Sequence, residues 1–369
     1  MPPDESEPPI GLTSIGCRSR RQRLAAALRI VDVDAMLVTD RRHIHYFTGQ
    51  WISSHQAPLL IIDASCACHL IVGDPPGPSI DPDVRVSLYA SRRLGTLVPD
   101  QLHASLLVAK SEIARFDKCG IDASNITLRQ IRNIMDLSSV MGTLRRAKDE
   151  DEVAIIRLAI QACEAAYACA AEIIRPGLRE IDLFAEMQSI AVRTVGEPIG
   201  ELGNDFRSGA MGGPPRVRKM AAGELLPLDM SIVVRGYHCD LCRTFVVGGE
   251  PSNEQLLATE KVQAALVHAK QQVHVGGDAR QLYEDVKLEL DGFNGWTFPH
   301  HLGHGIGLSA HEAPRINPDW SDRFATGDLF TLEPGLYGDA LRAGVRIEEN
   351  FWLSTDGLVQ LSNCPTQLK

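Results

Sequence analysis

Hydrophobic and polar positions change their spacing along this chain of 369 residues, and the changes predict two successive α/β regions. The stretch RRQRLAAALRIVDVDAMLVTD, residues 20–40, predicts a helix followed by a buried strand. HIHYFTGQ, residues 43–50, is expected to be a loop, and APLLIID and CHLIVGD to be strands. The alternation runs to about Met141, so residues 15–145 are predicted to form a domain behind a disordered, proline-rich leader at 1–14.

A charge-dense segment at residues 145–174 opens the second region. Its apolar residues recur at helical spacing, and the acidic cluster from Asp149 to Glu152 suits the positive end of a helix dipole. Further helices are expected at 180–195 and 252–275, together with two hairpins and a glycine-punctuated strand region that runs to the end. Residues 146–369 are therefore predicted to form a second domain.

Charge and composition limit the classes of binding partner and the cellular compartment that we expect for this protein. Lys plus Arg number 37 against 47 Asp plus Glu, a net charge of −10, which disfavours nucleic acid and anionic membranes as partners. We expect no membrane span, because no uncharged apolar run approaches the ~18 residues that one needs. Nine cysteines without a repeating spacing favour a reducing compartment, so a cytoplasmic protein is expected.

Two carboxylates interrupt an otherwise β-forming stretch, LLPLDMSIVVRGYHCDLCRTFVV. If the chain reverses near Val234 and Arg235, Asp229 and Asp240 stand directly opposite each other on antiparallel strands, ~5 Å apart at Cβ. Like charges at that distance repel unless a cation lies between them. The stretch therefore predicts a metal site.

A second hairpin repeats the pattern in FTLEPGLYGDALRAGVRIEEN. A turn centred near Ala340 and Leu341 places Glu333 opposite Glu348, and HHLGHGIGLSAHE, residues 300–312, adds four histidines. Four carboxylates and one imidazole exceed the needs of a single ion with an open position, but suit two divalent ions ~3.5–4 Å apart. The oxygen-rich set favours Mn²⁺, with Co²⁺ and Zn²⁺ as alternatives.

The order of these motifs resembles the pita-bread metallopeptidase family of prolidase, aminopeptidase P, methionine aminopeptidase and creatinase. The resemblance covers roughly residues 145–365, and HIHYFTGQ resembles a motif of the smaller creatinase-type domain. It implies the α/β (α+β) class, with a C-terminal pita-bread catalytic domain, a smaller N-terminal creatinase-type α/β domain, and a homodimer. It also implies a metallopeptidase of the Xaa-Pro dipeptidase or aminopeptidase kind, which uses a metal-bridging water.

The resemblance also assigns roles to individual residues. It implies that Asp229 and Asp240 hold one metal, that Asp240 and Glu348 bridge, and that His304 and Glu333 complete the second site. It implies four catalytic residues: His311 beside the tetrahedral intermediate, Glu333 as the expected proton acceptor, His300 facing the substrate, and Arg346 orienting the ligand carboxylates. Arg243 is implied as a second arginine that orients the ligand carboxylates. The glycines among the histidines are expected to let backbone approach metal and substrate closely.

Departures from the family pattern lie on the substrate side. Prolidases and aminopeptidases P carry a histidine in a Ser-Gly loop before the first metal aspartate; here Gly212 occupies that position. His301 stands where the family usually has glycine, and Arg216 or Arg218 could offer a partner to a substrate carboxylate. Three hypotheses remain: a peptidase of short peptides, a metal-dependent hydrolase or lyase of a small non-peptide metabolite, and a binding scaffold without turnover.

Overall fold

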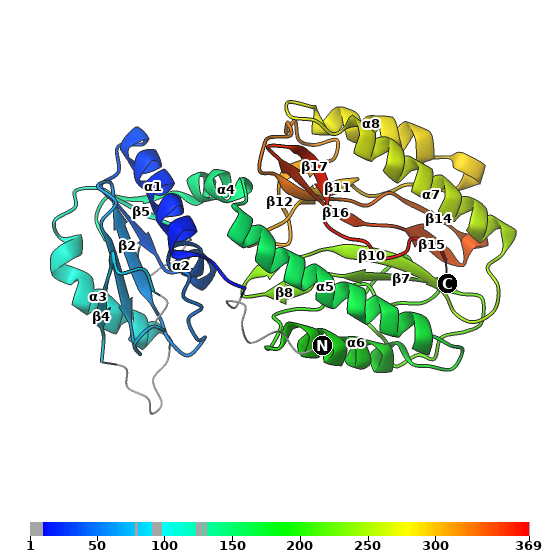
Figure 1. The fold of residues 1–369 in the computed structure, drawn as a ribbon, viewed down its shortest axis with the longest axis horizontal. Coiled ribbons are helices and arrows are strands. Elements are labelled where there is room, and N and C mark those ends of the chain that lie inside the picture. The colour runs from blue at the N-terminus through cyan, green and yellow to red at the C-terminus, as the bar shows by residue number, and fades with distance from the viewer. Residues whose placement is uncertain (1–9, 78–79, 91–97, 123–127, 129–130, 369) are drawn as a thin grey trace. The chain divides into compact units, whose positions relative to one another are not determined.

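The chain divides into two compact units, Met1–Arg145 and Arg146–Lys369, in the computed structural model (Figure 1). The structure describes residues 10–77, 80–90, 98–122, 128 and 131–368. Both units are mixed α/β, which confirms the predicted fold class. Of the predicted leader, residues 1–9 lie outside the described residues, and helix α1 begins at Ser14, one residue before the predicted start of the domain.

The first unit is built on a six-stranded mixed sheet with the strand order β4-β3-β2-β1-β5-β6. Helix α3 packs on it through Ala109 and Ile113, which share an apolar cluster with Leu37 and Ile61. Its elements, with α4 running to the boundary, are α1 (Ser14–Ile30), β1 (Ala35–Val38), α2 (Arg41–Thr48), β2 (Leu59–Asp63), β3 (Cys68–Val72), β4 (Val84–Leu88), α3 (Val98–Ile113), β5 (Cys119–Ile121), β6 (Ile134–Asp136) and α4 (Ser138–Arg146).

The prediction that residues 43–50 form a loop is wrong, because most of them belong to helix α2. The Asp40 side chain accepts a hydrogen bond from the Arg42 backbone N–H and caps the helix start. Gly49, with φ of 72°, ends the helix in the left-handed conformation that glycine adopts without strain. The helix has only eight residues, and its caps Asp40 and Gly49 are the local sequence signals that mark its two ends.

The second unit encloses its strands between two pairs of helices, α5 with α6 and α7 with α8 (Figure 1). A five-stranded sheet has the order β12-β11-β13-β16-β17, and β7 pairs with β10, β8 with β9, and β14 with β15. Its helices and strands are α5 (Glu150–Ile173), α6 (Glu180–Val195), β7 (Leu225–Met230), β8 (Val233–Val234), β9 (Tyr237–His238), β10 (Leu241–Val246), α7 (Asn253–Gln272), α8 (Ala279–Leu290), β11 (Gly303–Gly305), β12 (Glu312–Ile316), β13 (Leu329–Leu332), β14 (Gly335–Gly338), β15 (Ala343–Arg346), β16 (Glu349–Ser354) and β17 (Gly357–Gln360).

Apolar packing of α7 and α8 on the strands forms the main core of this unit. Val262 and Ala265 of α7 and Val286 and Leu290 of α8 are fully buried in one cluster with Phe330 and other strand residues. Helix α8 was not expected from the sequence, where that stretch was assigned to strands, although buried residues on it recur at helical spacing.

Helix α5 is long and apolar enough to cross a membrane by length and composition alone. However, 56% of its apolar window is buried inside the protein, as in the core helix of a globular domain. Its start is fixed by a capping box in which the side chains of Asp149 and Glu152 bond each other's backbone N–H groups. The acidic cluster therefore begins a core helix, as predicted.

The first unit should depend on the buried ion pair between Arg21 and Asp81. Arg21 donates to Asp81 across 2.8 Å, and their side chains are 2% and 0% exposed. We expect Asp81→Asn to destabilise this unit by about 3–5 kcal/mol, because it leaves a buried guanidinium without its counter-charge. Urea unfolding, followed by hydrogen–deuterium exchange of peptides from α1, measures this loss.

Asp83→Asn is the matched control for this prediction. The Asp83 side chain is 63% exposed and pairs with the half-exposed Arg18 across 2.9 Å. An exposed pair contributes about 0–1 kcal/mol, so this variant should unfold like the wild type. Equal losses in the two variants would contradict the prediction.

Candidate metal centre

The first predicted pair of carboxylates comes from the β7–β10 hairpin, but the aspartates do not face each other directly. Asp229 is paired with Cys242, two residues beyond the predicted partner Asp240. The reason lies in the turn, which is formed by Arg235 and Gly236, with φ of 49° and 85°, one position later than predicted. Two-residue hairpin turns require such positive φ values, which favour glycine.

A shift of two residues keeps the side chains on the same face, because side chains alternate along a strand with period two. Asp229 and Asp240 are thus diagonal neighbours on one face of the hairpin. Asn350 fixes the backbone of Asp240: its Oδ1 accepts from the Asp240 N–H at 3.2 Å, and its Nδ2 donates to the Asp240 carbonyl. Both aspartates therefore point into the same space, as the hypothesis requires.

The second predicted pair has the expected register. Leu332 pairs with Glu349 and Gly335 pairs with Arg346, so Glu333 and Glu348 lie at matching positions between these pairs. The Glu348 N–H donates to the Cys242 carbonyl at 3.1 Å, which ties this hairpin to β10. The two hairpins thus bring their carboxylates together.

His304 comes from the short strand β11, which lies between β12 and β13. A Cβ atom at Gly303 would lie 2.0 Å from the Thr331 carbonyl oxygen, and one at Gly305 would lie 2.2 Å from that of Ala313. The glycines expected to approach metal and substrate instead let neighbouring strands approach each other. Without them β11 could not hold His304 at this position.

The His304 ring has the tautomer that a metal ligand needs. Nδ1 lies 3.2 Å from the carbonyl of Gly305, so this nitrogen carries the proton and Nε2 has a free lone pair. Nε2 is 3.8 Å from Asp240, 3.7 Å from Glu333 and 4.0 Å from Glu348. Burial lowers the pKa of His304 to about 3, which keeps the imidazole neutral.

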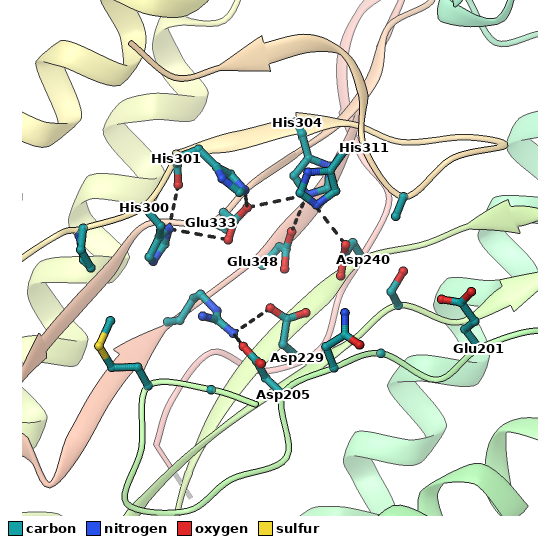
Figure 2. A pocket seen from close by; sticks show the side chains of 18 residues that line it. Glu201, Asp205, Asp229, Asp240, His300, His301, His304, His311, Glu333 and Glu348 are labelled. Carbon is teal, nitrogen blue, oxygen red and sulfur yellow. Dashed lines mark hydrogen bonds and ion pairs between the residues drawn. The ribbon is translucent and has the colours of Figure 1, made fainter. Parts of the chain in front are cut away.

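All these side chains line one cavity of about 550 Å³, within the range of small-molecule sites (Figure 2). The predicted ligands and catalytic residues that the structure brings together there are Asp229, Asp240, His300, His304, His311, Glu333, Arg346 and Glu348. Figure 2 shows the carboxylates of Glu333, Glu348 and Asp240 close to the stacked rings of His304 and His311.

The acids of the cavity carry strongly shifted pKa values. Burial, followed by the neighbouring Glu348, raises the pKa of Asp240 well above its usual range, and burial and Glu333 do the same to Glu348. Burial also raises the pKa of Asp229 to about 6. Without a cation Asp240 and Glu348 are therefore expected to hold shared protons well above the usual carboxyl range.

The donor set fits divalent cations. Two fully buried oxygens, Oδ1 of Asp240 and Oε1 of Glu348, have no hydrogen-bond partner among the described residues, a cost that a cation would remove. Ligand atoms lie within 4.8 Å of one another in two groups that both contain Glu348: Asp240, His304, Glu348 and Asp229, Glu333, Glu348. A residue shared by two groups is what a carboxylate bridge between two ions requires.

Glu333 differs from the other acids because imidazoles flank it. Burial would raise its pKa, but a hydrogen bond from His301 and the nearby His300 and His304 lower it to about 2. His300 lies against Tyr337, whose hydroxyl is 2.9 Å from Nε2, and burial lowers its pKa to about 4. Tyr337 was not predicted; it lies on strand β14, two residues after Gly335.

The two arginines implied to orient ligands do so differently. Arg346 donates to Asp229 at 2.8 Å and also pairs with Asp205, a cavity residue that sequence reasoning missed because it stands alone in a loop. Arg243 contacts no ligand carboxylate among its described partners. It bonds the Glu348 carbonyl at 2.8 Å and the Glu349 carboxylate at 2.5 Å, and so holds the backbone of the ligand.

The loop that lacks the family histidine packs closely against Asp205. A Cβ at Gly212 would lie 2.3 Å from an Asp205 oxygen, so no side chain fits there without rearrangement. The idea that an arginine of this loop reaches the cavity is wrong. Arg216 is held by Glu180 at 2.6 Å and Arg218 by Glu224 and Ser208, and neither lines the cavity.

Comparison with known proteins identifies both units. Residues 154–355 match the model of metallopeptidase family M24, and residues 20–139 match the creatinase/prolidase N-terminal domain. A putative dipeptidase YkvY of Bacillus subtilis is 27% identical over 242 residues, which are 62% of this chain and 63% of that protein. The match thus spans less than two thirds of that relative's length.

Two further relatives agree in sequence or fold. An Xaa-Pro dipeptidase of Pyrococcus furiosus is 29% identical over 243 residues, 64% of this chain and 69% of its own length. The crystal structure of a prolidase from Pyrococcus horikoshii superposes with a TM-score of 0.76 over 95% of this chain and all of that chain, at 21% identity. These matches confirm the pita-bread fold with a creatinase-type N-terminal domain.

Metal binding should release protons at neutral pH, because the pKa values of Asp240 and Glu348 are raised in the protein without metal. We expect about one proton or more per chain. Calorimetric titration of chelator-treated protein with Mn²⁺ or Zn²⁺, in two buffers of different ionisation enthalpy, counts them. Proton release below one tenth per chain would contradict the shared-proton state.

The sign of the accompanying pH dependence is fixed. A carboxyl group whose pKa is raised by folding contributes stability that is fully present below its unfolded pKa of about 4 and is lost as pH rises through the folded value. The lowered pKa values of His300 and His304 act in the opposite direction, but only up to about pH 7, where the histidines of the unfolded chain are neutral too. The Tm of chelator-treated protein should therefore fall between about pH 7 and 9, and added metal should reverse the fall. A Tm that rises over this range would contradict the assignment.

Proposed function

Because the chain belongs to metallopeptidase family M24, we propose that it is a hydrolase of short peptides, of the Xaa-Pro dipeptidase or aminopeptidase kind, with a centre for two divalent cations. The observation that carries the proposal is the convergence of four carboxylates and a neutral imidazole on one cavity, with buried oxygens that lack hydrogen-bond partners among the described residues. Such an arrangement is costly unless cations occupy it.

Five side chains would hold the cations. Asp229 and Asp240 are proposed for one position, His304 and Glu333 for the other, and Asp240 and Glu348 for the bridge between them. The geometry supports Glu348 as a bridge, because its oxygens lie within 4.8 Å of ligand atoms of Asp240 and His304 and also of Asp229 and Glu333. Divalent cations at such a centre make water nucleophilic near neutral pH and polarise the scissile carbonyl. The oxygen-rich donors favour Mn²⁺, with Co²⁺ or Zn²⁺ as alternatives.

The remaining residues are proposed to move protons and position the substrate. Glu333 is anionic, with a pKa of about 2, and is the proposed acceptor of the proton that the attacking water loses. His311 lines the cavity and is proposed to donate a hydrogen bond to the developing oxyanion. His300 is proposed to face the substrate, and Arg346 keeps Asp229 oriented.

A small non-peptide metabolite remains the second candidate substrate, and a specific observation favours it. The loop residue that binds the scissile amide in prolidase-like members is absent, and Asp205 fills the space beside Gly212. A scaffold without turnover is disfavoured, since all five ligand side chains are present in the cavity. A homodimer in the cytoplasm is the assembly and location proposed.

Weak cleavage of Xaa-Pro dipeptides is expected, because one missing donor lowers the rate by about 10²–10³ rather than abolishing it. Protein loaded with Mn²⁺, Co²⁺ or Zn²⁺ should be incubated with Xaa-Pro and Xaa-Ala dipeptides and with longer Xaa-Pro peptides. Amino-acid release is the readout, and chelator-treated protein is the control. If no amino acid is released from any peptide although the metal content is verified, the peptidase proposal is wrong and a small non-peptide metabolite is the favoured substrate.

Two substitutions should separate metal binding from turnover. Asp240→Asn removes a proposed bridging charge while preserving size, so metal content measured by mass spectrometry should drop at least about tenfold. His311→Ala should retain metal and lower kcat/KM by about 10²–10³, the cost of one lost oxyanion donor. Loss of metal from the His311→Ala protein would show that His311 acts as a ligand instead.

A further inference from the structure

His301 occupies a position where the family usually has glycine, and it contacts the proposed metal ligand Glu333 directly. Its Nε2 lies 2.7 Å from Oε1 of Glu333, the shortest contact that this carboxylate makes with any imidazole of the cavity (Figure 2). The Glu333 side chain is 8% exposed and that of His301 is 32% exposed, so the imidazole reaches the carboxylate from the open side of the cavity.

The oxygen that His301 contacts is also the one that faces the proposed metal position. Oε1 of Glu333 lies 3.7 Å from Nε2 of His304, whereas the other oxygen, Oε2, lies 3.8 Å from His300. Two atoms bound to one cation at about 2.0–2.2 Å each stand no more than ~4.4 Å apart, so Oε1 and His304 have the spacing of two ligands. A carboxylate oxygen has a lone pair left for a hydrogen bond after it binds a cation.

A three-histidine cation site would be another explanation of this cluster, but the ring geometry argues against it. His301, His304 and His311 offer nitrogens within 4.8 Å of one another. The rings of His304 and His311, however, are stacked 3.7 Å apart and within 14° of parallel. Ring lone pairs lie in the ring plane, so two stacked imidazoles cannot both point at one ion.

His301 itself is placed as a hydrogen-bond donor rather than a ligand. A separation of 2.7 Å between nitrogen and carboxylate oxygen is that of a charge-assisted hydrogen bond, so Nε2 carries the proton. The ring meets that of His304 at 75° and does not stack on it. Its N–H group therefore points at the Glu333 carboxylate. The other cavity imidazoles that contact this carboxylate, His300 and His304, lie 3.8 Å and 3.7 Å from it, beyond hydrogen-bond distance.

We propose that His301 is a positioning residue that holds the Glu333 carboxylate in its metal-binding orientation. This inference rests on the proposed function. Glu333 stands among like charges, with ligand oxygens of Asp229 and Glu348 within 4.8 Å, and a flexible side chain under such repulsion would turn towards the open cavity. The imidazole donor prevents that movement, so the cation meets a ligand that is already oriented.

The test is a titration of chelator-treated protein with Co²⁺, monitored by visible absorption and by calorimetry. His301→Gly, which installs the residue usual in the family, should weaken binding by about 10- to 100-fold, the range for loss of a hydrogen bond to a metal ligand. His301→Gln keeps a donor at similar reach and should bind within about threefold of the wild type. His268→Ala, at an exposed histidine of α7, is the control and should bind like the wild type.

Each outcome decides the proposal. Equal affinity of the wild type and the His301→Gly protein would overturn the positioning role while leaving the proposed function intact. A smaller number of bound Co²⁺ ions at saturation in both His301→Gly and His301→Gln would make His301 a ligand and also overturn it. A wild-type protein that binds no cation would overturn the proposed function itself. Circular dichroism of each variant confirms that it folds.

Discussion

The mutual repulsion of four carboxylates in one buried volume is the constraint on which the second unit depends. Asp229, Asp240, Glu333 and Glu348 would separate if their backbones could move, because burial strengthens the repulsion between like charges. The hairpins prevent this: strand pairing fixes each backbone, and the hydrogen bond from Glu348 to the Cys242 carbonyl joins the two hairpins. The apolar packing of α7 and α8 on these strands supplies the rigidity.

Counter-charges complete the arrangement around the acids. Arg346 neutralises part of the charge of Asp229 and Asp205, and Arg243 donates hydrogen bonds to the carbonyl of Glu348 and the carboxylate of Glu349. Both arginines are almost fully buried and therefore tolerate no loss of a partner. Protein groups nonetheless leave oxygens of the cluster without hydrogen bonds among the described residues, which is why the proposed cations form part of the charge balance.

The two sides of the cavity differ in how they serve the proposed reaction. On the metal side all five proposed ligands line the cavity, and His301 adds a donor to Glu333. On the substrate side the short loop around Gly212 packs against Asp205. Arg216 and Arg218 of that loop form ion pairs with Glu180 and Glu224. The proposed ligands thus converge in the cavity, whereas Gly212 offers no side chain to a substrate, so substrate identity is the property that the cavity leaves most open to experiment.

The sequence by itself determined the fold class, the helices at the start of the second unit and the set of acids, because these follow from periodicity, capping residues and carboxylates misplaced in strands. The register of the second hairpin was also predictable, because a turn at Ala340 and Leu341 places Glu333 opposite Glu348. The tertiary structure decided the rest. The positive φ of Arg235 moved the first turn, α2 depended on its caps, and the loop arginines followed buried acids distant in sequence. The turn and the caps are local features whose choice among alternatives packing settled, whereas the pairing of the arginines depends on distant partners that no local pattern records.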